Sequence, residues 1–124
     1  MDYTRAEEFT IDGKKFVYID FSGLRKNEDF IGLVKTIEPV IAKYPEHSLY
    51  TITNIENVRF DSSSKILVAE FMKNNKPYVK YGVVIGLDGI KKIMLRAAFK
   101  LSGRANMSFA FTKEQAIEWL LQQE

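Results

Sequence analysis

One continuous apolar run constrains the fold of this chain more than any other feature. The segment Tyr81-Gly82-Val83-Val84-Ile85-Gly86-Leu87 contains no charged residue. A strand that is covered on one face alternates apolar and polar residues, whereas a strand covered on both faces is apolar throughout. The run therefore predicts a central strand with other elements packed on both sides of the sheet.

Extended and helical patterns alternate along the rest of the chain. Residues 9–11 and 16–21 are β-prone and flank Asp12-Gly13, a dipeptide that favours a tight hairpin because glycine accepts positive φ. Because strands that alternate with helices need crossover connections, the sheet should be mostly parallel. The predicted fold class is α/β, with a mostly parallel five-stranded sheet, an N-terminal antiparallel hairpin and about four helices. The further predicted strands cover 49–55 and 107–111, and the helices cover about 27–44, 66–72, 90–101 and 113–120.

Local signals predict how these helices begin and end. Asn27 is the expected N-cap of the first helix, and Pro39 inside that helix predicts a kink or a break. Gly103 is the expected C-terminal cap of the third helix, and Thr112-x-x-Gln115 has the pattern of a capping box. We expect Phe109, Phe111 and Trp119 to pack in the core beneath the last helix.

Composition removes several classes of function. The 124 residues suffice for one domain, which we expect to span residues 1–124. Because the chain has no cysteine and a single histidine, His47, we expect no disulfide, thiol nucleophile, metal site or Ser-His-Asp triad, and no cofactor. The N-terminus has no signal-peptide pattern and no run is long enough to cross a bilayer, so we expect a cytoplasmic protein.

A resemblance to a known family is carried by short motifs along most of the chain. The strand from Leu49 and the following Val58-Arg59-Phe60-Asp61-Ser62-Ser63 resemble the core of STAS domains, in which an apolar strand leads to an Asp-Ser-Ser-Gly turn at a helix N-terminus. The segments 75–80, 84–87 and 111–120 extend the resemblance to single-domain SpoIIAA-like, CRAL-TRIO-related bacterial proteins. This resemblance implies a regulatory or ligand-binding module rather than a catalyst.

The serine cluster is the first candidate site. The resemblance implies a phosphoacceptor at Ser63, which matches the second serine of the family motif, although Ser64 stands where the family has glycine. A helix N-terminus offers unpaired amides and a positive dipole end to an anion, so Asp61, Ser62 and Ser63 form a candidate phosphoacceptor or anion-binding turn. The alternative is that these residues only cap a helix.

A second candidate is the glycine-containing loop at residues 86–89, which precedes Lys91 and Lys92. A strand that runs into such a loop and a helix can bind phosphate. The segment lacks the spacing of both nucleotide-binding glycine motifs, and an ordinary tight turn explains it as well.

The third predicted helix concentrates basic charge. Residues 89–104 include five cations, among them Arg104, and no acid, so with a net charge of +2 the rest of the chain carries −3. At 100° per residue, Ile90, Ile93, Met94, Ala97 and Leu101 form one arc, which we expect to face the core. Leu95 and Phe99 would then form an exposed ridge between cations. The predicted docking ridge consists of Lys91, Lys92, Leu95, Arg96, Phe99 and Lys100. The alternative is that a neighbouring segment covers Leu95 and Phe99.

These features favour a non-catalytic binding module over an enzyme. We expect it to act through a protein partner or an amphiphilic or anionic ligand; peripheral contact with an anionic membrane and a homodimer are further options for the ridge. Nucleic-acid binding is not expected, because sixteen acids leave a weak basic footprint. The alternative function is a small enzyme that uses the carboxylates of Asp20, Asp61 and Asp88 at the strand ends.

Overall fold

The sheet follows the order of its strands in the chain. A computed structural model describes residues 5–59, 61–103 and 105–123, so Phe60 of the serine motif and Arg104 of the basic segment lie outside the described residues. The sheet order is β1-β2-β3-β4-β5; β1 and β2 pair antiparallel and the other neighbours pair parallel. The predicted fold class is confirmed. The elements are β1 Ala6–Ile11, β2 Lys14–Asp20, α1 Asn27–Ala42, β3 Leu49–Asn54, α2 Ser62–Asn75, β4 Val79–Ile85, α3 Gly89–Ser102, β5 Met107–Phe109 and α4 Lys113–Leu121.

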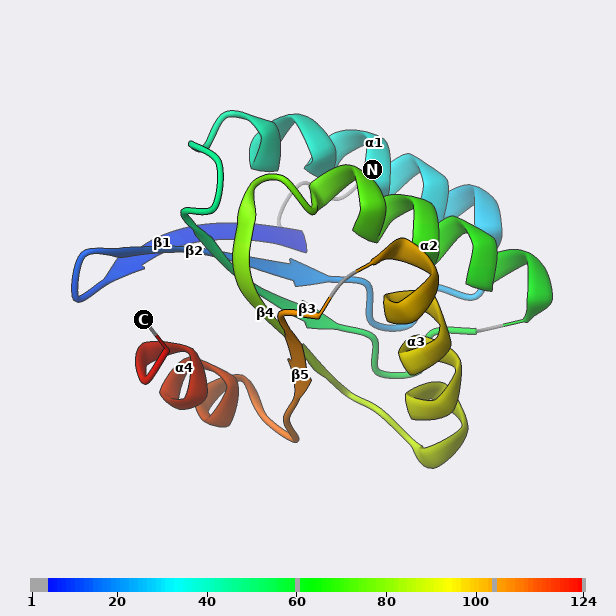
Figure 1. Cartoon of the computed structure of the whole chain (residues 1–124). Helices are drawn as coiled ribbons and strands as arrows, with labels where there is room; N and C mark the ends of the chain where they lie inside the picture. The colour runs from blue at the N-terminus through cyan, green and yellow to red at the C-terminus, as the bar shows by residue number, and fades with distance from the viewer. Residues whose placement is uncertain (1–4, 60, 104, 124) are drawn as a thin grey trace.

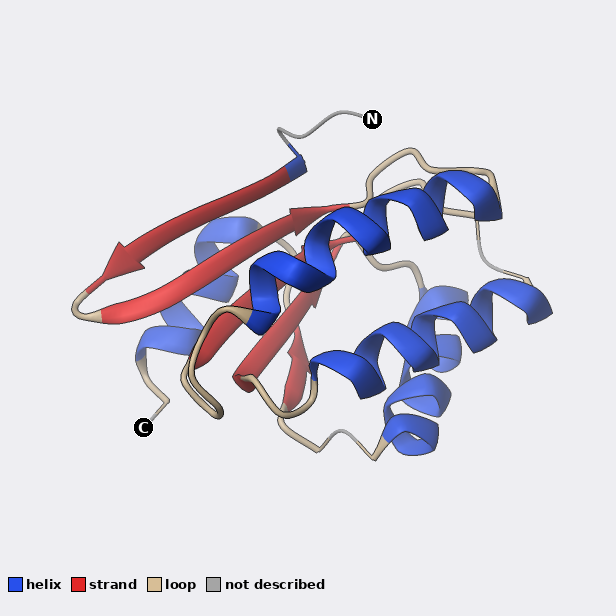
Figure 2. Ribbon diagram, turned by 90° about the horizontal axis from the view of Figure 1, so that it is seen from above, coloured by secondary structure: helices blue, strands red, loops and turns tan. Residues whose placement is uncertain are grey.

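Helices cover both faces of the sheet. Three parallel crossovers in one direction place α1, α2 and α3 on the same face, and α4 returns to the opposite face (Figures 1 and 2). Strand β4 shows this division, since Val84 packs in the core below α1, α2 and α3 whereas Val83 and Ile85 pack with Ala116 and Leu120 of α4. The uninterrupted apolar run is thus explained by burial on both sides.

The hairpin forms where the sequence predicts it. Asp12 and Gly13 both have positive φ, at 52° and 79°, which is the backbone of a two-residue turn whose twist matches that of the flanking strands. Phe9 and Phe16 pair across the hairpin with their rings stacked at 5.1 Å. A local turn signal and a cross-strand aromatic pair therefore specify this part of the fold together.

Two expectations about α1 need correction. Asn27 is not the N-cap: Lys26 holds that position without a side-chain hydrogen bond, and Asn27 is the first helical residue. The side chain of Asn27 instead forms hydrogen bonds with Ser63 and Ser64 at the start of α2. Of the predicted kink or break at Pro39, the break is wrong, because the helix runs through this residue to Ala42.

The expected aromatic core beneath α4 is also only partly present. Trp119 packs edge-on against Tyr81 of β4 at 6.0 Å. Phe109 instead stacks on Phe99 of α3, on the opposite face, and Phe111 is exposed. Strand β5 ends at Phe109, so Phe111 no longer follows the alternation of the sheet.

Candidate functional site

The serine turn forms the N-terminus of α2. Asp61 is the N-cap residue, and its Oδ1 accepts hydrogen bonds from the backbone amides of Ser63 and Ser64, each at 3.0 Å. This is the standard way in which an aspartate satisfies amides that have no partner inside the helix. The expected capping role of the turn is confirmed.

The three serines of this turn occupy different environments. Ser62 and Ser63 are exposed, whereas Ser64 is only 6% exposed. The Ser63 hydroxyl donates to Oδ1 of Asp61 at 2.6 Å and accepts from Nδ2 of Asn27 at 2.8 Å. Ser64 Oγ lies 3.0 Å from Oδ1 of Asn27, on the inner side of the turn. The turn therefore presents two hydroxyls to solvent and fixes one of them by side-chain hydrogen bonds.

These hydrogen bonds shift the titration of the capping carboxylate. The hydroxyl of Ser63 and the amides of Ser64 and Ser63 stabilise the charged form and lower the pKa of Asp61 to about 2. Arg59 adds a distant charge, with Nη2 lying 3.9 Å from Oδ2 of Asp61. The turn carries a fixed negative charge in the neutral pH range.

A shallow groove adjoins the serine turn at the carboxyl edge of the sheet. It holds about 360 Å³ and is formed by the loops that follow β2, β3 and β4 and by the first turns of α3. Three cations line it, against one acid. The lining residues are Arg25, Asn57, Val58, Arg59, Asp88, Ile90, Lys91 and Met94. Basic and apolar side chains thus extend from the serine turn to α3.

The glycine loop after β4 is a tight turn. Gly86 has a φ of 84°, and a Cβ atom at this residue would lie 2.5 Å from the backbone nitrogen of Glu56, so the approach of two loops requires glycine. Asp88 caps α3 by accepting from the amide of Lys91 at 2.9 Å. Both observations give the loop a structural role.

The three carboxylates at the strand ends are occupied by local backbone hydrogen bonds. Asp20 accepts from the amide of Ser22 at 2.9 Å, and Asp61 and Asp88 cap α2 and α3. An acid–base mechanism needs groups that converge on one substrate. Open α/β sheets form a ligand crevice where the strand order reverses. The order β1-β2-β3-β4-β5 contains no such reversal.

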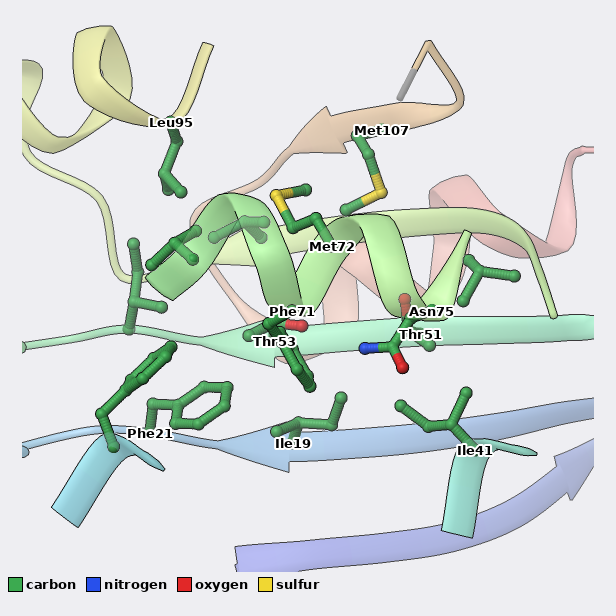
Figure 3. Close-up of a pocket in the computed structure, with 15 residues that line it drawn as sticks. Ile19, Phe21, Ile41, Thr51, Thr53, Phe71, Met72, Asn75, Leu95 and Met107 are labelled. Carbon is green, nitrogen blue, oxygen red and sulfur yellow. The ribbon is translucent and has the colours of Figure 1, made fainter. Parts of the chain in front are cut away.

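A small cavity lies between the sheet and helices α1 and α2 (Figure 3). Its lining is apolar except for Thr51 and Thr53 of β3 and Asn75 at the end of α2. The volume of about 40 Å³ has room for roughly three water molecules, at ~10–15 Å³ for each. The cavity is too small for an acyl chain, and none of the three strand-end carboxylates lines it.

The predicted ridge on α3 is wrong in its apolar part. Leu95 and Phe99 are 3% and 7% exposed and belong to the core. The arc expected to face inward is turned to solvent, since Ile90, Ile93 and Leu101 are among the exposed large apolar residues. The physical reason is that α3 packs against α2 and against Phe109 of β5, which places Leu95, Ala98 and Phe99 on the inner side. Lys91 lies partly buried, with Nζ 3.5 Å from the carbonyl oxygen of Ile55.

Two solved structures have a fold similar to that of this chain. Similarity is found to the anti-sigma factor antagonist SpoIIAA in its unphosphorylated form, with 20% identity, a TM-score of 0.59 and coverage of 96% of this chain and 98% of that chain. A second is an anti-sigma-factor antagonist (STAS) domain protein from Planctomyces limnophilus, with 13% identity, a TM-score of 0.58 and coverage of 93% and 97%. This chain has the STAS fold. No protein-family model and no curated protein matches the sequence.

The side chain of Ser64 lies on the inner side of the serine turn. In this STAS-fold domain the side chain of Ser64 points inward, between Asn27 and the carbonyl oxygen of Arg59. Ser64 therefore adds no bulk to the exposed side of the turn, where Ser62 and Ser63 lie.

Sequence reasoning missed Asn27 as a member of this turn. Asn27 is far from the serines along the chain, and its amide bridges Ser63 and Ser64. No local pattern could reveal this contact, because it depends on how α1 and α2 pack. In the described part of the STAS-fold domain, no helix combines the length and hydrophobicity that a membrane span needs.

Proposed function

We propose that this domain is a non-catalytic regulatory module that binds a protein partner through the serine turn and the adjoining groove, and that Ser63 is its phosphoacceptor. The observation that carries the proposal is the exposed Ser63 hydroxyl in the first turn of α2, held between Asp61 and Asn27. The STAS fold and the Asp-Ser-Ser resemblance support this position for the modified residue.

A phosphate on Ser63 would change the turn in two ways. The modified oxygen has no proton, so the hydrogen bond to Asp61 would be lost, and nearly two negative charges would lie beside a carboxylate that is already charged. The α2 N-terminus and the guanidinium of Arg59 would partly offset this repulsion. Phosphorylation would therefore change both the charge and the shape that a partner contacts.

The groove supports a protein as the partner. Arg25, Arg59 and Lys91 would attract acidic side chains, while Ile90 and Met94 offer apolar contact at the same edge. A combination of apolar and charged contacts is typical of protein interfaces. An amphiphilic ligand has less support, because the cavity between sheet and helices holds about 40 Å³.

The alternative function, catalysis by the strand-end carboxylates, has less support as well. Asp20, Asp61 and Asp88 each accept a backbone hydrogen bond, which gives each a structural role. A regulatory module needs only an accessible hydroxyl and a recognisable surface, and both are at hand around Ser63.

The test is the mass of the protein isolated from its native cells. We expect a fraction of molecules to carry one phosphate, which peptide mapping should assign to Ser63. The phosphate should be lost in Ser63→Ala and retained in the matched variant Ser62→Ala, since both serines are exposed but only Ser63 is held by Asp61. If no phosphate is found under several growth conditions, or if it remains in Ser63→Ala, Ser63 is not the phosphoacceptor.

A further inference from the structure

Helix α3 turns its larger apolar arc to solvent. Ile90, Ile93 and Leu101 are 74%, 71% and 68% exposed, and with Ala97 they form one stripe along the helix, here called the outer face of α3. Figures 1 and 2 show α3 at the end of the helical layer, with no helix or strand drawn against the side turned away from α2. Three large aliphatic side chains on one exposed helical face form an apolar patch that needs an explanation.

Cations flank this outer face along one side. Lys92, Arg96 and Lys100 follow at four-residue spacing, and no acidic residue occurs between residues 89 and 103. The first two contact the ring of Phe109 on the β5 side of the helix, with Lys92 Nζ at 5.6 Å and the Arg96 guanidinium at 5.8 Å from its centroid. By helical spacing, these three positive charges lie along the border between the apolar stripe and the buried face of α3.

We propose that the outer face of α3 docks on the surface of an anionic lipid bilayer, with the helix axis in the plane of the membrane. An apolar helical face flanked by lysine and arginine is the pattern of a helix that lies at a lipid–water interface. The aliphatic side chains would enter the boundary of the acyl chains, and Lys92, Arg96 and Lys100 would meet the headgroup phosphates.

A second copy of the chain fits this face less well. A helix of 14 residues is about 21 Å long, so one face of it buries a few hundred Å², below the ~800 Å² that each partner contributes to a stable dimer. Pairing two copies through α3 would also bring the cations of both copies together.

A folded protein partner fits it less well too. Ile90 borders the groove beside the serine turn, but Ile93 and Leu101, the other large side chains of the face, line none of the grooves found on the described residues, so most of the face offers no recess for an anchoring side chain. Between residues 89 and 103 the charged side chains of α3 are all cations, whereas protein interfaces usually have both donors and acceptors at the rim. A bilayer needs neither a recess nor an acceptor, because it presents a broad apolar layer below a sheet of negative charge.

Flotation with vesicles tests the proposal on the full chain. We expect the protein to bind vesicles of equal parts phosphatidylglycerol and phosphatidylcholine, and to bind pure phosphatidylcholine at least tenfold more weakly. Ile93→Gln and Leu101→Gln should each weaken binding to the anionic vesicles by about tenfold or more. Replacing Lys92, Arg96 and Lys100 by Gln should weaken it by roughly fivefold for each charge and should reduce its dependence on salt.

Ile66→Gln is the matched control. Ile66 is 58% exposed on α2, so the substitution removes a similar exposed side chain outside α3 and should leave vesicle binding unchanged. Absence of binding to the anionic vesicles overturns the proposal, and so does an equal loss in Ile66→Gln. A concentration-dependent dimer in sedimentation that Ile93→Gln abolishes would assign the face to a second copy instead.

A fluorescent label can show which face meets the lipid. The chain has no cysteine, so Ile93→Cys and Ile66→Cys each accept one polarity-sensitive dye. Anionic vesicles should shift the emission to the blue at residue 93 and leave it unchanged at residue 66; the reverse result excludes the outer face of α3. Ser63→Ala should bind vesicles as the unmodified chain does, so this test stands apart from the function proposed for the serine turn.

Discussion

The sequence predicts the structure at the N-terminus of α2 correctly, but it predicts the wrong buried face for α3. At α2, Asp61 and the serines that follow it predict a capped helix, and Asp61 caps the amides of Ser63 and Ser64. At α3, the apolar periodicity predicts an inner face that the structure turns to solvent. A cap is satisfied by residues two and three positions away, whereas the orientation of a helix depends on the elements that it packs against. Contacts between residues close in the chain can therefore be predicted from sequence more reliably than the face of a helix that is buried.

The largest expected effect separates the two sides of α3. Phe99→Ala should lower the free energy of unfolding by about 3–5 kcal/mol, because it opens a cavity beside Phe109 in the core. Ile93→Ala on the outer face should change it by no more than about 0.5 kcal/mol. Urea unfolding measures both. A larger loss for Ile93→Ala than for Phe99→Ala would mean that α3 has the orientation that its periodicity predicts.

A smaller effect separates the inner and outer serines of the α2 turn. Ser64→Ala should cost about 1–2 kcal/mol, because the buried hydroxyl bonds within the turn and its loss leaves Asn27 Oδ1 without this donor. Ser62→Ala is the control and should stay within about 0.5 kcal/mol, since Ser62 is exposed. Chemical denaturation of the two variants checks this difference, and a larger cost for Ser62→Ala would contradict the placement of the serines.

The smallest effect depends on pH. The pKa of Asp61 is lowered to about 2 in the folded chain from an ordinary value of 3.8, so its charged form stabilises the fold above about pH 4 and this contribution is lost as the pH falls toward 2. Asp61→Ala should therefore melt a few degrees below the unmodified chain at pH 6, and the gap should narrow as the pH falls to 2.

Asp61→Asn serves as the control for charge, because its amide oxygen still accepts from the helix amides. Its melting temperature should lie between those of the unmodified chain and Asp61→Ala at pH 6. Thermal melts at pH 6, 4 and 2 measure the series. A gap that persists unchanged at pH 2 would mean that the carboxylate charge adds nothing to the cap.

Much of the fold follows from short segments of the sequence. Asp12-Gly13 specifies the hairpin, the apolar run of β4 specifies a doubly covered strand, and Gly103 at a φ of 72° ends α3. Thr112 caps α4 by accepting from the amide of Gln115, as its motif predicts. In each case the residues that carry the signal also make the contact or adopt the backbone conformation, so nothing beyond the segment is needed.

The candidate sites also differ in whether they depend on local or on tertiary contacts. The sequence by itself determined the serine turn with its Asp61 cap, because the capping contacts span only three residues. Only the tertiary structure decided that Asn27 joins this turn from α1, that Phe111 is exposed and that Leu95 and Phe99 are buried. Periodicity shows which side chains share a face of α3, but the packing of α3 against α2 and Phe109 decides which face is buried. That selection leaves Ile90, Ile93 and Leu101 in solvent.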